Sequence, residues 1–220
     1  MPSTVDYNKI IRNAANSVLR PNGLFQKGTS RVWIDDNGWY LTIVEFQPSG
    51  YMKGSYLNVA IHYLWCEIDY FTFDYGSRIG GFKEFTGDAE QFQDEMTELA
   101  QTAICQVREY RRFSDLQYAK RQILKAKAAN KTHELYHKLM ICGLCEDAAA
   151  RKYFFQMKEK LQNIDFASER EYLKELVERI EPIIDDSQAL RAYIVAKILR
   201  QRDFWRNKSG MKQMREQITI

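Results

Sequence analysis

Two histidines and two cysteines in the second half of the chain have a spacing that suits a metal ion. His133 and His137 lie four residues apart, and Cys142 and Cys145 follow as a Cys-x2-Cys pair. Histidines four apart share a helix face, and a Cys-x2-Cys turn can hold a tetrahedral zinc ion. In the alternative interpretation, the helix ends at Gly143 and both cysteines fill a helical hairpin as small apolar side chains. Because no second cysteine pair is present, we favour the hairpin and expect neither metal nor cofactor.

Three polar residues in the first half have the order found in some metal-dependent nucleases. Asp36 precedes Glu45 and Gln47. Such enzymes hold Mg²⁺ between two carboxylates, while a lysine or sometimes a glutamine orients the attacking water. A spacing of two places Glu45 and Gln47 on one face of a strand, as this chemistry requires. Against it, Asp36 begins an Asp-Asn-Gly turn, where aspartate is ordinary, and the lysine is missing. A nuclease is therefore the alternative function, not the preferred one.

Two basic stretches could bind the phosphates of nucleic acid. Arginines with aromatic neighbours can stack on unpaired bases, and five arginines are the candidates: Arg108, Arg111, Arg112, Arg202 and Arg206. The alternative is a solvated helix face whose arginines meet acidic neighbours such as Glu109 and Asp203, with the aromatic rings packed inward. We favour the solvated face, because the whole chain carries a net charge of only +3.

The positions of apolar residues and of turn residues predict an α+β fold. Helical spacing with caps at Ser3 and Thr4 predicts a first helix that ends near residue 20. Alternating strands follow over residues 31–35, 39–47, 56–65, 68–75 and 78–82, and Asn37-Gly38 predicts a type I′ hairpin turn. We expect this helix to pack on an antiparallel sheet of four to five strands. An all-helical half of stacked αα-hairpins then completes the chain.

Aromatic residues and charges divide the chain in the same way. Residues 1–86 hold 16 of the 29 Phe, Trp and Tyr residues and carry no net charge, whereas the remainder carries all of the +3. Large flat side chains favour a pleated surface. We therefore expect a helix-plus-sheet module over 1–86, a helical module over 87–206 and a frayed tail over 207–220.

The sequence contains neither a membrane-spanning stretch nor an export signal. No run of about 18 apolar residues occurs, and the N-terminus lacks a basic start followed by an apolar segment. We expect a cytoplasmic protein with reduced cysteines and without membrane contact.

One resemblance adds to this interpretation. It is carried by five segments of the first half: residues 23–28, 39–44, 46–49, 57–61 and 78–80. Over about residues 8–115 they resemble a bacterial family known as domain of unknown function 4304. The chain departs from the family pattern at Leu24-Phe25, where glycine and phenylalanine are not adjacent, and at Ala60, where a glycine is usual.

The resemblance implies no activity, cofactor or catalytic residue. It does imply a shared polar cluster of Gln47, Ser49, Asn58 and Arg78, which forms either a binding cleft or a hydrogen-bonded brace for the sheet. We favour the brace, because polar groups at strand ends need partners in any case. The preferred function is a non-enzymatic binding or adaptor protein with a protein partner.

Overall fold

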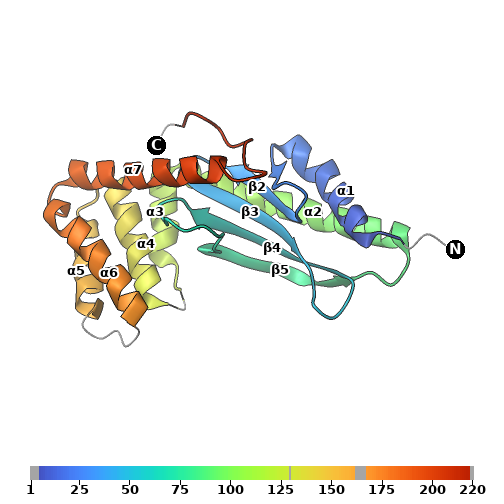
Figure 1. Ribbon diagram of the computed structural model, residues 1–220, viewed down its shortest axis with the longest axis horizontal. Helices are drawn as coiled ribbons and strands as arrows, with labels where there is room; N and C mark the ends of the chain where they lie inside the picture. The colour runs from blue at the N-terminus through green and yellow to red at the C-terminus, as the bar shows by residue number, and fades with distance from the viewer. Residues whose placement is uncertain (1–4, 129, 162–166, 219–220) are drawn as a thin grey trace. The chain divides into compact units, whose positions relative to one another are not determined.

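The computed structural model describes residues 5–128, 130–161 and 167–218 and has the expected α+β fold (Figure 1). A first helix and a five-stranded antiparallel sheet precede a helical second half with packed helix pairs. The strands are β1 (Phe25–Gln26), β2 (Val32–Asp36), β3 (Tyr40–Gln47), β4 (Gly54–Tyr63) and β5 (Tyr75–Glu84). The α-helices are α1 (Tyr7–Leu19), α2 (Ala89–Arg111), α3 (Leu116–Lys125), α4 (Lys131–Leu144), α5 (Ala149–Leu161), α6 (Ala167–Ile180) and α7 (Ser187–Arg206); the 3₁₀ turns are η1 (Arg20–Asn22), η2 (Arg112–Ser114) and η3 (Glu181–Ile183).

Aspartate side chains start both helices that pack on the sheet. Asp6 accepts the N–H groups of Asn8 and Lys9 at the start of α1, and Asp88 does the same for the first turn of α2. Each carboxylate satisfies backbone donors that have no partner inside the helix. The caps expected at Ser3 and Thr4 lie outside the described residues.

The sheet is a simple meander in the order β1-β2-β3-β4-β5, and every neighbouring pair is antiparallel. The predicted hairpin at Asn37-Gly38 is present, but its turn differs from type I′. Only Gly38 of the two has a positive φ, at 86°, whereas type I′ requires positive φ at both central residues. The Asp36 side chain accepts the Gly38 N–H at 3.1 Å, which fixes this turn.

The two faces of the sheet have different surroundings. Trp33 donates to Asn16 of α1 at 3.0 Å, and the Tyr40 hydroxyl donates to the Tyr110 carbonyl of α2 at 2.7 Å. Because side chains alternate along a strand, these residues define the face that α1 and α2 cover. Glu45 and its cross-strand partner Asn58 lie on the opposite face.

The strand predicted at 68–75 is wrong, because residues 68–74 form a loop. The loop is tied to β4 by a backbone hydrogen bond from the Asp74 N–H to the Ile61 carbonyl at 2.9 Å and by side-chain contacts. His62 Nδ1 accepts the Thr72 N–H at 3.3 Å, and Asp74 accepts the Tyr63 N–H at 2.7 Å. Phe71 stacks on Trp205 with ring centroids 4.3 Å apart. The short strand predicted at 78–82 is the middle of the longer β5.

The expected frayed tail is wrong for residues 207–218. Met211 and Met214 are 0% and 2% exposed, and the backbone at Gly210 passes so close to Gly28 that a Cβ atom there would lie 2.3 Å from the Gly28 nitrogen. Burying two methionine side chains contributes a few kcal/mol, on the order of 1.5–3 for each. The segment is therefore an integral part of the fold.

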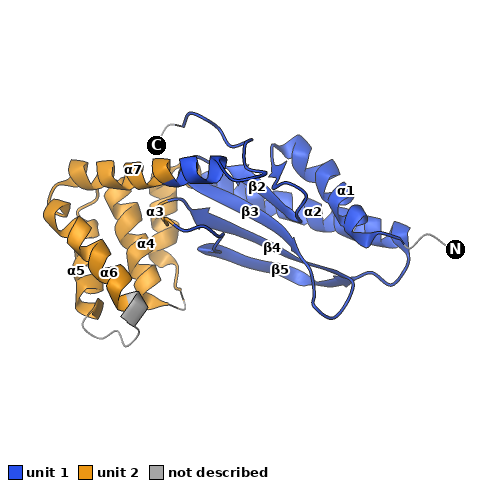
Figure 2. Ribbon diagram, in the orientation of Figure 1, with its two compact units in different colours: residues 1–64, 68–112, 201–220 blue, residues 65–67, 113–200 orange. Residues whose placement is uncertain are grey.

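Contacts divide the chain into two compact units (Figure 2). The first contains residues 1–64, 68–112 and 201–220, and the second contains residues 65–67 and 113–200. The expected boundary at 86 separates sheet from helix in the sequence. The compact units divide elsewhere, because α2 and the C-terminal segment belong with the sheet.

The second unit is built from helical hairpins. Helices α4 and α5 are joined by a tight turn at Glu146, which has a positive φ of 53°. Gly143 near the end of α4 lies against the side chains of Leu190 and Ile194 of α7, which would have to shift to admit a Cβ atom. In the described part of the chain, none of the helices has both the length and the apolar character needed to cross a bilayer.

Candidate functional site

The predicted zinc ligands do not gather around one point. No three of His133, His137, Cys142 and Cys145 bring ligand atoms within 4.8 Å of one another. His137 Nδ1 instead accepts the indole N–H of Trp65 at 3.1 Å. Burial raises the pKa of Cys142 to about 12 and also raises the pKa of Cys145. Cys142 is buried, whereas Cys145 is half-buried and donates to the Leu116 carbonyl at 3.7 Å.

The predicted nuclease residues are also separated. Asp36 pairs with Leu41 in the β2–β3 ladder, whereas Glu45 pairs with Val32. The two carboxylates therefore lie four residue pairs apart on the same face, about 14 Å at 3.4 Å per residue. One metal ion cannot bridge that distance.

The Asp36 carboxylate is occupied by the C-terminal segment. It accepts two hydrogen bonds from the Arg202 guanidinium, at 2.6 and 2.8 Å, and the Arg215 N–H at 2.8 Å. Burial acts to raise the pKa of Asp36, but the hydrogen bonds and charge of Arg202, with the N–H groups of Arg215 and Gly38, lower the pKa below its ordinary value. This carboxylate holds the fold together, and no position remains on it for a metal ion.

The predicted polar cluster brings three of its four residues together. The Asn58 side-chain amide donates to Gln47 Oε1 at 2.8 Å. Arg78 donates to the same oxygen at 2.8 Å and to Asn58 Oδ1 at 3.4 Å. Ser49 lies apart, because its hydroxyl accepts the N–H groups of Tyr51 and Met52 in the β3–β4 turn.

Two further residues complete this cluster. Glu45 accepts the Asn58 amide at 2.8 Å, and the Arg78 guanidinium lies over the Tyr56 ring at 3.8 Å. Strand register explains the assembly, because Glu45, Asn58 and Arg78 are neighbours across β3, β4 and β5. We name Glu45, Gln47, Tyr56, Asn58 and Arg78 the Arg78 cluster.

Arg78 is an exposed side chain that is held in place without a counter-ion. Its hydrogen-bond acceptors, Gln47 and Asn58, are neutral amides. Among the described residues, none of the ion pairs includes Arg78. A guanidinium fixed by an aromatic ring and two amides, but not neutralised, can still pair with a carboxylate or a phosphate.

Comparison with known proteins gives no relative. No protein-family model, curated protein or solved structure matches the chain. The resemblance to domain of unknown function 4304 therefore stays a prediction, and the site has to be judged on its own geometry.

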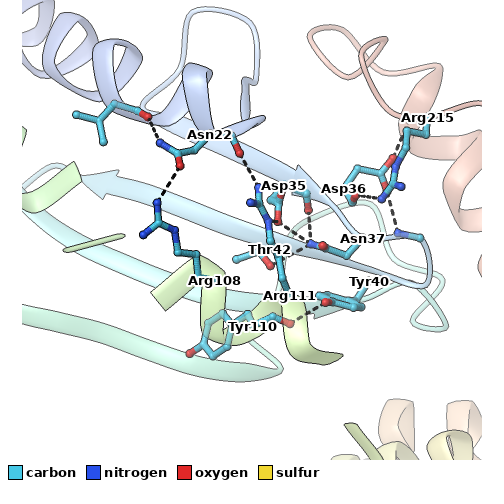
Figure 3. Close-up of polar contacts among 12 residues, drawn as sticks. Asn22, Asp35, Asp36, Asn37, Tyr40, Thr42, Arg108, Tyr110, Arg111 and Arg215 are labelled. Carbon is cyan, nitrogen blue, oxygen red and sulfur yellow. Dashed lines mark hydrogen bonds and ion pairs between the residues drawn. The ribbon is translucent and has the colours of Figure 1, made fainter. Parts of the chain in front are cut away.

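The five arginines considered for nucleic acid have internal partners. Arg111 makes a bidentate pair with Asp35 at 2.8 and 2.9 Å (Figure 3), and these hydrogen bonds raise the pKa of Arg111. Arg112 pairs with Glu109, Arg202 with Asp36, and Arg206 with Glu216, while Arg108 donates to the Asn22 side chain. Arg112 meets Glu109 as the solvated-face interpretation expects, whereas Arg202 is buried and Arg108 meets a neutral amide. Binding of nucleic acid through these arginines stays a prediction.

The sequence indicated some of these residues only weakly and gave no sign of the pair between Asp36 and Arg202. The period-two spacing of Glu45 and Gln47 put both residues on one face, and counting from the Asn37-Gly38 turn would have placed Glu45 far from Asp36. Tyr56 lies two residues before Asn58 and so shares its face. The pairing of Asp36 with Arg202 spans 166 residues, and no local pattern marks it.

Proposed function

We propose that this chain is a non-enzymatic binding or adaptor protein that holds a protein partner through an acidic group at Arg78. The observation that carries the proposal is the exposed guanidinium of Arg78, which is held by Gln47, Asn58 and Tyr56 and has no carboxylate partner among the described residues. A fixed arginine loses little conformational entropy when it binds, so more of the interaction energy remains as affinity.

The Arg78 cluster also favours binding over catalysis. Its only ionisable groups besides Arg78 are Glu45 and the Tyr56 phenol, and the Glu45 carboxylate is engaged by Asn58. The cluster offers neither a pair of carboxylates nor a nucleophile next to a base, which hydrolytic chemistry requires. The resemblance to domain of unknown function 4304 fits this proposal, because Gln47, Asn58 and Arg78 belong to the segments that carry it.

The affinity of a blocked tetraglutamate peptide, measured by calorimetry at low ionic strength, tests the proposal. We expect Arg78→Gln to weaken binding at least tenfold. Arg78→Lys should weaken it too, because lysine lacks the planar fork. Lys9→Gln removes the same charge from an exposed position on α1 and is the matched control, with an expected change below about twofold.

A variant with the opposite expected effect sharpens this test. Glu45→Gln keeps an oxygen that can accept the Asn58 amide but removes a negative charge near Arg78. Because like charges repel only weakly in water-like surroundings, the acidic peptide should bind at most about twofold more tightly. If Arg78→Gln behaves like Lys9→Gln, the proposal is wrong.

A further inference from the structure

The Arg78 cluster lies beside a long unpaired sheet edge. β5 (Tyr75–Glu84) has ten residues and is the last strand of the sheet (Figure 1). The other edge strand, β1, has only two residues. Most residues of β5 are exposed, among them Gly76, Ser77 and Arg78. Since β5 pairs with β4 alone, alternate N–H and C=O groups along it point away from the sheet.

Two consecutive glycines, Gly80 and Gly81, lie in the middle of β5. Gly80 has a positive φ of 69° next to the irregular register at Ser55 and Leu57, which gives it a conformational reason to be glycine. Gly81 has no such φ, and no atom lies within 4 Å of the position that its Cβ would take. Gly80, Gly81 and Phe82 lie in the irregular stretch of β5 opposite Tyr56, between the pairs Leu57–Ile79 and Ser55–Lys83. A glycine within a strand often marks a place where another backbone approaches.

Charge at this edge selects one kind of partner. Arg78 is in the regular part of β5, in register with Asn58, and Lys83 and Glu84 follow together at the end of the strand. The carboxylate nearest in the register, Glu45, is engaged by Asn58. A segment that carried a carboxylate next to Arg78 would complement this edge, whereas a basic segment would be repelled.

We propose that β5 takes up an extended peptide segment of a partner protein as a sixth strand, and that this segment presents an Asp or Glu side chain to Arg78. Main-chain hydrogen bonds along the edge would supply general affinity, and the charged pair would supply specificity. Side chains directly opposite on neighbouring strands have Cβ atoms about 4.5–5.5 Å apart. Because Asn58 and Tyr56 hold the Arg78 guanidinium over β4, the acidic side chain has to extend across the face of β5 to meet it. The inference rests on the proposed function and adds how the partner is held.

Selection from a displayed library of random ten-residue peptides against the full chain tests this inference. We expect the selected peptides to share Asp or Glu at one position, and a synthetic copy to bind Arg78→Gln at least tenfold more weakly than Lys9→Gln. Hydrogen–deuterium exchange should slow at least tenfold at outward-facing amides within residues 77–83 when the synthetic peptide is bound.

Backbone methylation of the same peptide distinguishes strand addition to β5 from recognition of a carboxylate by Arg78. N-methyl groups on one set of alternate amides should reduce affinity at least tenfold and those on the other set much less, because only one edge of the peptide faces β5. Equal effects of the two sets, or protection outside residues 77–83, would overturn strand addition while leaving carboxylate recognition at Arg78 intact. Failure to select any acidic peptide that depends on Arg78 would overturn both.

Discussion

Arg202 and Asp36 form a bidentate ion pair whose side chains are 3% and 5% exposed. Arg202 also donates to the carbonyls of Gly38 and Arg215, and Arg215 in turn donates to Asp36 through both its backbone and its side chain (Figure 3). This single carboxylate therefore ties residues 202–215 to the β2–β3 hairpin.

Removing the Asp36 carboxylate should destabilise the protein strongly. Asp36→Ala leaves the Arg202 guanidinium buried without its anion, and we expect the free energy of unfolding in urea to fall by about 3–5 kcal/mol. Glu216→Gln is the control, because its partner Arg206 and Glu216 form an exposed pair in the same segment, and an exposed pair contributes only about 0–1 kcal/mol. A loss near that of the control would show that the ion pair does not hold the segment.

His62 should make the stability depend on pH. Its side chain is fully buried, and burial lowers its pKa from 6.5 to about 4. The Thr72 N–H points at Nδ1, so in this neutral ring the proton lies on Nε2. The unfolded chain therefore binds the extra proton more readily between pH 6.5 and 4.

The resulting loss of stability occurs as the pH falls. The contribution of His62 is complete above pH 6.5 and decreases toward pH 4, by up to about 3 kcal/mol at 1.36 kcal/mol per pKa unit. The difference in unfolding free energy between wild type and His62→Phe, followed from pH 7 to pH 4.5, should change in this direction. A difference that stays constant with pH would refute the assignment of a neutral His62.

Gly143→Ala in α4 should destabilise the second unit, although alanine favours helices. An added Cβ would lie 2.6 Å from Ile194 Cδ1 and 2.8 Å from Leu190 Cδ2. Overpacking of this kind costs about 1–3 kcal/mol and outweighs the gain of about 1 kcal/mol in helix propensity. Gly50→Ala, which meets no atom within 4 Å, is the matched control. A higher melting temperature for Gly143→Ala would contradict the packing described here.

The sequence predicted the fold class because it depends on local patterns. Alternating residues in β3, the Asn37-Gly38 turn and helical spacing after residue 88 each act over a few positions. Several residues of the Arg78 cluster could be predicted for the same reason, since strand register follows from the turns. Ser49 was wrongly included, because its position near a strand end does not distinguish a turn cap from a member of the cluster.

Long-range contacts could not be predicted in the same way. The strand expected at 68–75 has the right composition, but Phe71 turns away to stack on Trp205, more than 130 residues later. The tail after 206 is rich in polar residues, and its two buried methionines carry no periodic signal. The carboxylate of Asp36 resembled a metal ligand only because Arg202, its partner, is remote in sequence.

The nuclear magnetic resonance signal of the Arg78 Nε–Hε group reports on whether this guanidinium receives a carboxylate. On addition of blocked tetraglutamate, we expect a saturable shift of this signal and of the side-chain amide signals of Gln47 and Asn58. Blocked tetraglutamine should leave all three unchanged. An Arg78 signal that does not move, or that moves equally with both peptides, would show that Arg78 does not bind a carboxylate.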